Sequence, residues 1–177
     1  HLPSAEGVPT PLAFNGVIAG AAGHLTYAAQ IHAYMRALAE ASPRVAVFSM
    51  GTTEEGREMI AVAIADEATV ASLDRYREIT RRLADPRAVD DDTAASLIAE
   101  GKPIYHLTGG LHSPETGSPE MLMELAYRLA VAATEPVRSM SQLPCCHRLR
   151  PRSVPTHSWP SRARRSVVTL SLATPSS

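Results

Sequence analysis

The residues best suited to chemistry are a histidine and a glutamate three positions apart, His112 and Glu115. A neutral imidazole nitrogen and a carboxylate oxygen are both ligands that zinc accepts, and catalytic zinc sites use three protein ligands and a water molecule. A zinc ion bound there would lower the pKa of its water towards neutrality and polarise a carbonyl group. The pair therefore supplies two of the three candidate ligands for Zn²⁺. The plainer alternative is a surface loop whose glutamate favours the positive end of a following helix.

The elements around the pair are those that could position such a site. Residues 104–108 are β-branched, aromatic or apolar, apart from one histidine, and predict a buried strand. Gly109 and Gly110 then allow a tight turn, and residues 121–131 predict a helix. In open α/β sheets, sites usually lie outside the carboxyl ends of strands. The pair stands at such a position.

Further elements alternate along the chain upstream of the pair. We expect a helix capped by Thr26 and ending near residue 40, and a second capped by Asp90. The other expected elements are strands at 45–50 and 59–64 and a helix at 73–83. Helices alternating with strands indicate an α/β architecture.

The sequence around the pair, Gly-Gly-Leu-His-Ser-Pro-Glu-Thr at residues 109–116, resembles the zinc-binding segment of the carboxypeptidase A-like metallopeptidases, the zinc carboxypeptidase family. Residues 27–44 are similar to the family's first helix, and residues 49–60, with Gly-Thr-Thr-Glu-Glu-Gly-Arg, to its first hairpin. The resemblance covers about residues 8–135. Pro114 stands where pancreatic-type members carry a substrate-contacting arginine, which suggests a bacterial-type subgroup.

The resemblance implies a mixed sheet flanked by helices, with His112 and Glu115 as zinc ligands. It also implies proteolysis: a zinc-activated water would hydrolyse a peptide or protein substrate and release its C-terminal residues. Family members are usually exported, so we expect a secreted or periplasmic protein. The same resemblance assigns Glu120 and Glu124 no ligand role, and we expect them to be solvated or to lie behind the ligands. His106 is expected to be an ordinary sheet or core histidine.

The family's later motifs find no match here. These are a third ligand histidine, the arginines and tyrosine that bind substrate, and the general-base glutamate, so the catalytic residues stay unassigned. His147 and His157 lie in surroundings that do not match. We therefore expect the N-terminal portion of such an enzyme, with an incomplete fold and no activity by itself.

Composition divides the 177-residue chain sharply. All 18 acidic residues lie at or before Glu135, whereas seven arginines and no lysine follow it. We divide the chain into an extended lead-in (1–23), a catalytic-domain portion (24–135) and a basic Pro/Ser/Arg-rich tail (136–177). The tail is either disordered or the product of a frameshift; its stretch 167–172 could form a short strand, with no obvious place in the sheet.

A second class of function stays open. The chain could be a non-catalytic binding module whose arginine-rich tail contacts an acidic partner. Net charge is −1, so nucleic acid is not an expected partner unless the tail is genuine. No apolar run reaches the roughly 18 residues that a membrane helix needs, and no membrane association is expected.

Overall fold

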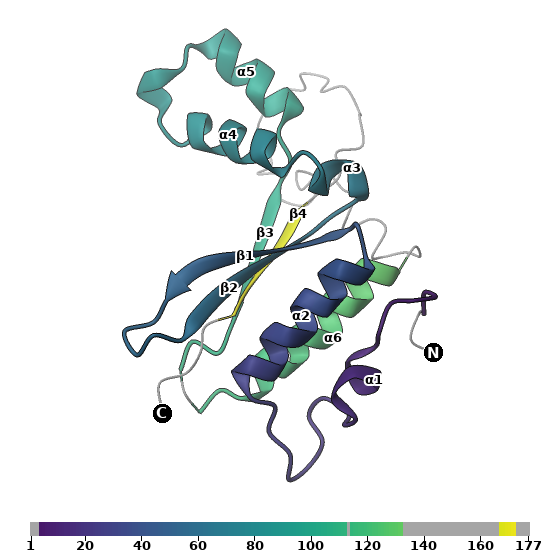
Figure 1. The fold of residues 1–177 in the computed structure, drawn as a ribbon. Coiled ribbons are helices and arrows are strands. Elements are labelled where there is room, and N and C mark those ends of the chain that lie inside the picture. The colour runs from purple at the N-terminus through teal and green to yellow at the C-terminus, as the bar shows by residue number, and fades with distance from the viewer. Residues whose placement is uncertain (1–3, 113, 133–166, 173–177) are drawn as a thin grey trace, which may run out of the picture.

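A computed structural model describes residues 4–112, 114–132 and 167–172 (Figure 1). One four-stranded sheet has the order β1-β2-β4-β3. The β1–β2 and β2–β4 pairs are antiparallel and the β3–β4 pair is parallel, so the sheet is mixed. The strands are β1 (Val45–Thr52), β2 (Glu58–Ile64), β3 (Ile104–Gly109) and β4 (Val167–Leu172). The predicted α/β class with a mixed sheet is confirmed.

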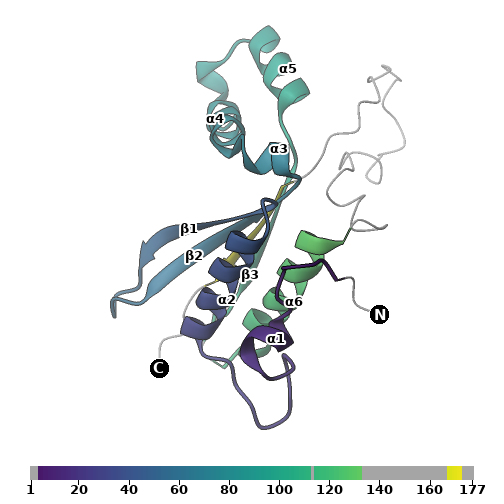
Figure 2. The same cartoon turned by 45° about the vertical axis from the view of Figure 1, so that its right-hand side comes forward.

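Two long helices, α2 (Ala28–Ala41) and α6 (Gly117–Val131), lie side by side on one face of this sheet (Figures 1 and 2). Alternate side chains of a strand point to opposite faces, and side chains of β1 and β2 on this face pack against the helices. The buried core that results consists of Ile31, Tyr34, Met35, Leu38, Val45, Ile60, Val62, Ile64, Leu122, Met123, Ala126, Tyr127, Leu129 and Ala130. Each fully buried large apolar side chain contributes about 1.5–3 kcal/mol.

An arginine fixes the far end of α6. The guanidinium of Arg44, in the turn before β1, donates to the carbonyl oxygens of Ala130 and Ala132 at 3.0 and 3.3 Å. These carbonyls belong to the last turn of the helix, where carbonyl oxygens have no N–H partner within the helix. A cation at this end also interacts favourably with the helix dipole. The helix that follows the candidate zinc ligands is therefore held at its carboxyl end as well as by the core.

The predicted hairpin is confirmed. Strands β1 and β2 pair from Val45↔Ile64 to Thr52↔Glu58, with an irregularity between Ser49 and Gly51. The turn between the strands includes an ion pair between Arg57 and Glu55. Gly51 has a φ of 101°, which side-chain-bearing residues rarely adopt, so a glycine suits this bulge.

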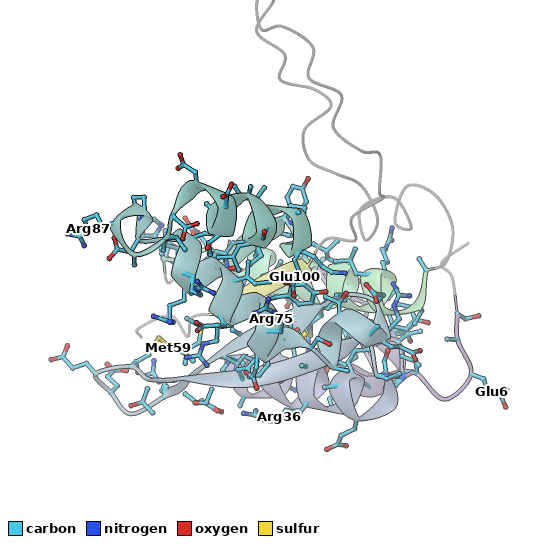
Figure 3. The ribbon with its side chains drawn as sticks, turned by 90° about the horizontal axis from the view of Figure 1, so that it is seen from above. Glu6, Arg36, Met59, Arg75, Arg87 and Glu100 are labelled. Carbon is cyan, nitrogen blue, oxygen red and sulfur yellow. The ribbon has the colours of Figure 1, made fainter. Side chains whose placement is uncertain are left out.

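A small helical lobe joins β2 to β3 at one end of the molecule (Figure 1). Its elements are α3 (Glu67–Val70), α4 (Leu73–Leu83), η1 (Pro86–Ala88) and α5 (Asp91–Glu100). The predicted cap is confirmed, because the Asp90 carboxylate accepts the backbone N–H of Thr93 at 2.7 Å. The Arg75 guanidinium donates to Glu100 at 2.7 Å and joins α4 to α5, and Figure 3 shows Arg87 at the lobe's outer end.

Strand β4 corrects one expectation about the tail. The sequence predicts no place in the sheet for residues 167–172, but β4 lies between β2 and β3, with Val62↔Leu170 and Leu107↔Leu170 as facing pairs. It pairs on both sides, and its rows of backbone donors and acceptors link the hairpin to β3. The rest of the proposed tail, 136–166 and 173–177, lies outside the described residues, so its frameshift or disorder stays a prediction.

The segment before α2 contains a short helix that the sequence did not reveal, α1 (Pro11–Asn15). The Thr10 hydroxyl accepts the N–H of Ala13 at 3.0 Å, and Pro11 occupies the first helical position. The predicted cap at Thr26 is wrong: α2 begins one residue later, after Tyr27, whose N–H donates to the Gln30 side chain at 3.0 Å. No helix in the described part of the chain is long and apolar enough to span a membrane.

Candidate metal centre

The two glycines at the end of β3 have different physical roles. A Cβ added to Gly109 would lie 2.7 Å from Cδ1 of Leu122 and 3.2 Å from the backbone carbon of Ser118. Gly109 therefore lets the strand end touch the first turns of α6. Gly110 has a φ of 73°, in the left-handed region that favours glycine. Together they turn the chain into the metal loop, which we define by its described residues 110–112 and 114–116.

The candidate ligands meet in this loop. Nδ1 of His112 lies 2.7 Å from Oε1 of Glu115, and the N–H of His112 approaches Oε2 of the same carboxylate at 3.3 Å. The N–H of Glu115 donates in return to the carbonyl oxygen of His112 at 3.0 Å. The two bonds that the Glu115 carboxylate accepts from His112 lower the pKa of this carboxyl, the side-chain bond being the larger cause. A carboxylate that stays ionised is the form that binds a cation.

Ser118 holds both ends of the metal loop. Its hydroxyl accepts the N–H of Gly110 at 3.1 Å and donates to the carbonyl oxygen of Glu115 at 3.2 Å. One side chain in the first turn of α6 thus bridges the residue after the strand and the second candidate ligand. Sequence reasoning passed over Ser118, although a serine at the start of a helix that follows a glycine turn is a recognisable signal.

The surroundings of the loop are more open than predicted. Strand β3 is not buried: Ile104, Tyr105 and Leu107 are between 37% and 48% exposed. The prediction of a buried strand is wrong because helix α6 meets β3 mainly at its last residue, Gly109, which is buried. An apolar run alone does not tell whether layers cover both faces of a strand.

The donor set fits a zinc ion in type, since zinc accepts an imidazole nitrogen and a carboxylate oxygen. The His112 nitrogen and the Glu115 oxygen are 2.7 Å apart, a hydrogen-bond distance, so they would exchange this bond for bonds to the metal. Among the described residues no group of three His, Cys, Asp or Glu side chains gathers at one point. His147 and His157 lie outside the described part.

Comparison with known families supports the same chemistry. The model of the family described as zinc carboxypeptidase matches residues 31–141, which include the metal loop, the hairpin, α6 and all of α2 but its first three residues. The chain belongs to the zinc carboxypeptidase family. No curated protein and no solved structure matches the chain.

Three other residues of this zinc carboxypeptidase family member can now be placed. His106 is exposed on β3, with its Nε2 3.1 Å from the Thr108 hydroxyl, and so is a sheet histidine. Glu120 is not solvated, because only 4% of its surface is exposed. Glu124 is half-buried, and its Oε2 is buried without a hydrogen-bond partner among the described residues.

Proposed function

We propose that His112 and Glu115 bind zinc and that the ion serves the hydrolysis of a peptide bond near the C-terminus of a peptide or protein. The observation that carries the proposal is the convergence of one imidazole nitrogen and one carboxylate oxygen, 2.7 Å apart, in a loop within the matched zinc carboxypeptidase region. When bound, zinc supplies an acidic water and polarises the scissile carbonyl.

The chain's own residues have definable tasks in this proposal. His112 offers a ring nitrogen only when neutral, and Glu115 offers a carboxylate, whose ionised form its hydrogen bonds favour. Ser118 keeps the two ends of the metal loop at a fixed separation, so that the ligands need not be ordered when the metal arrives. Both candidate ligands face solvent, with 67% and 48% of their side chains exposed, so a peptide can approach them.

The test is zinc binding by the chain, which does not require that the chain alone be active. His112→Ala and Glu115→Ala are the critical variants, and His106→Ala is the matched control, because it removes an exposed histidine from the neighbouring strand. Zinc binding that needs His112 and Glu115 but not His106 supports the proposal. Zinc binding that survives both critical substitutions would refute it.

Two finer expectations belong to the same proposal. Inactivity of the chain by itself stays a prediction, and a separate assay tests it: release of a C-terminal residue from an N-terminally blocked peptide by the purified chain with zinc would contradict it. Export to the periplasm or the exterior is proposed from family resemblance, and fractionation of cells that express the gene tests it.

A further inference from the structure

Glu120 is an almost fully buried carboxylate, close to the start of α6. Its Oε2 accepts the backbone N–H of Gly20 at 2.5 Å, and its Oε1 accepts that of Thr26 at 2.7 Å. Both oxygens therefore bind a segment about a hundred positions earlier in the chain. Hydrogen bonds to an ionised carboxylate are about twice as strong as those between neutral groups.

The segment that Glu120 holds is the N-terminal loop, defined as residues 16–26. It precedes residue 31, where the match to the zinc carboxypeptidase family begins. Other contacts tie the chain on its N-terminal side to the core: the Tyr34 hydroxyl donates to the carbonyl oxygen of Pro9 at 3.2 Å, and the Phe14 ring packs edge-on against Tyr34. The N-terminal loop is thus fastened at both ends.

The metal loop and the N-terminal loop are held by neighbouring turns of one helix. Ser118 binds the metal loop, and Glu120, two residues later, binds the N-terminal loop. Figures 1 and 2 show both loops at the same end of the molecule, at the amino end of α6. We propose that Glu120 is a positioning residue, which seats the N-terminal loop against α6 and thereby fixes the metal loop for zinc binding.

The charge of Glu120 is consistent with this role. Burial raises the pKa of its carboxyl, but hydrogen bonds from Thr26 and Gly20 and the nearby His24 outweigh burial and hold the pKa below its ordinary value. The helix N-terminus also favours the anion. An ionised carboxylate has acceptor capacity on both oxygens, which two separate backbone donors require.

The first readout is amide hydrogen exchange in the metal-free chain, for the wild type and Glu120→Gln. Glutamine keeps one carbonyl oxygen, so one of the two N–H groups loses its partner. We expect exchange at Gly20 or Thr26 to quicken roughly tenfold or more. If Glu120 positions the metal loop, exchange at Gly110 and Glu115, whose amides donate to Ser118 and His112, quickens in the same variant.

The second readout rests on the proposed zinc function. Co²⁺ replaces zinc as a spectroscopic probe, and Glu120→Gln is expected to change the visible spectrum of bound Co²⁺ and weaken its binding roughly tenfold, as loss of a residue that orients ligands does. Glu120→Asp, whose shorter side chain cannot reach both donors, should act in the same direction if Glu120→Gln fails to fold.

Glu124→Gln is the matched control, because it removes a carboxylate one turn later in α6 whose Oε2 has no partner among the described residues. The control should leave exchange at Gly110 and Glu115 unchanged. Quicker exchange at Gly20 or Thr26 with unchanged exchange at Gly110 and Glu115 would overturn the proposal. Failure of the zinc proposal is distinct from this: the wild type would then bind no Co²⁺, while the amide readout still reports on Glu120.

Discussion

The helical layer and the metal loop are joined at the first turn of α6 but differ in how they are held. In the layer formed by α2 and α6, Tyr34, Leu38 and Tyr127 are wholly buried, and the contacts are apolar and numerous. In the metal loop, His112 and Glu115 are 67% and 48% exposed, and a handful of hydrogen bonds fix the backbone. The chain thus gets its stability from one region and its candidate chemistry from the other.

This difference means that folding and zinc binding should respond to different substitutions. Close packing makes a core sensitive to the loss of a few methylene groups. An exposed loop loses little stability when a side chain is removed, but it loses its ligand geometry when an anchoring hydrogen bond is broken. The predictions below test this separation, beginning with the largest effect.

The helical layer should show the largest loss of stability. Leu38→Ala removes a side chain of α2 that is 0% exposed, and we expect the free energy of unfolding to fall by about 3 kcal/mol. Urea unfolding measures this change. Leu25→Ala is the control, since that leucine is 62% exposed, and its effect should stay within about 0.5 kcal/mol. Equal effects at the two positions would mean that α2 is not packed as described.

The junction between the regions should respond to a single added methyl group. Gly109→Ala places a Cβ 2.7 Å from Cδ1 of the buried Leu122 and 3.2 Å from the backbone carbon of Ser118, so the Leu122 side chain must move and the backbone must shift slightly, at a cost of about 1–3 kcal/mol. The matched control is Gly117→Ala, where no atom outside its immediate neighbours lies within 4 Å of the added Cβ. Thermal unfolding of both variants measures the difference. A Gly109→Ala protein as stable as the wild type would contradict the close contact between the end of β3 and α6.

A smaller effect should appear as acid sensitivity of the helical layer. Burial lowers the pKa of His32 on α2, although Glu58 on β2 raises it; Arg36 lowers it further. The folded chain therefore binds the proton less readily than the unfolded chain. The neutral ring's contribution to stability is complete above the unfolded pKa near 6.5 and is lost as the pH falls below it.

Urea unfolding at pH 7 and pH 5 measures this dependence. His32→Gln cannot titrate in this range, so its stability should change less between the two pH values than that of the wild type. The stabilising contribution of Glu120 should change little between these two pH values, because the pKa of its carboxyl in the folded chain is lowered from the ordinary value and the contribution is lost only as the pH falls further. If the free energy of unfolding changed equally with pH in the wild type and in His32→Gln, His32 would not be the cause of the acid sensitivity.

Much of the fold follows from local patterns in the sequence. The apolar spacing of α2, the alternation in β1 and β2 and the side-chain cap at Asp90 are all short-range signals, and the structure confirms them. The place of β4 is not a local property. It depends on pairing with two strands far away in the chain, which no pattern within residues 167–172 specifies.

The candidate site divides in the same way. His112 and Glu115 stand out because their types and spacing suit zinc, and Gly110 is explained by its left-handed φ. The sequence does not predict the contacts of Glu120, because its partners are the backbone N–H groups of Gly20 and Thr26. Every residue except proline has such a group, so the pattern of side chains does not identify these two. Burial of a carboxylate becomes interpretable only when its donors are known.

Zinc titration of the purified chain, followed by calorimetry and by the NMR signals of the imidazole rings, tests the central claim most directly. The account predicts that zinc shifts the ring signals of His112 and that His112→Ala weakens binding by at least roughly tenfold. It predicts that His106→Ala, on the adjoining strand, binds zinc as the wild type does. Zinc binding that is unchanged in His112→Ala, or no zinc binding by the wild type, would contradict it.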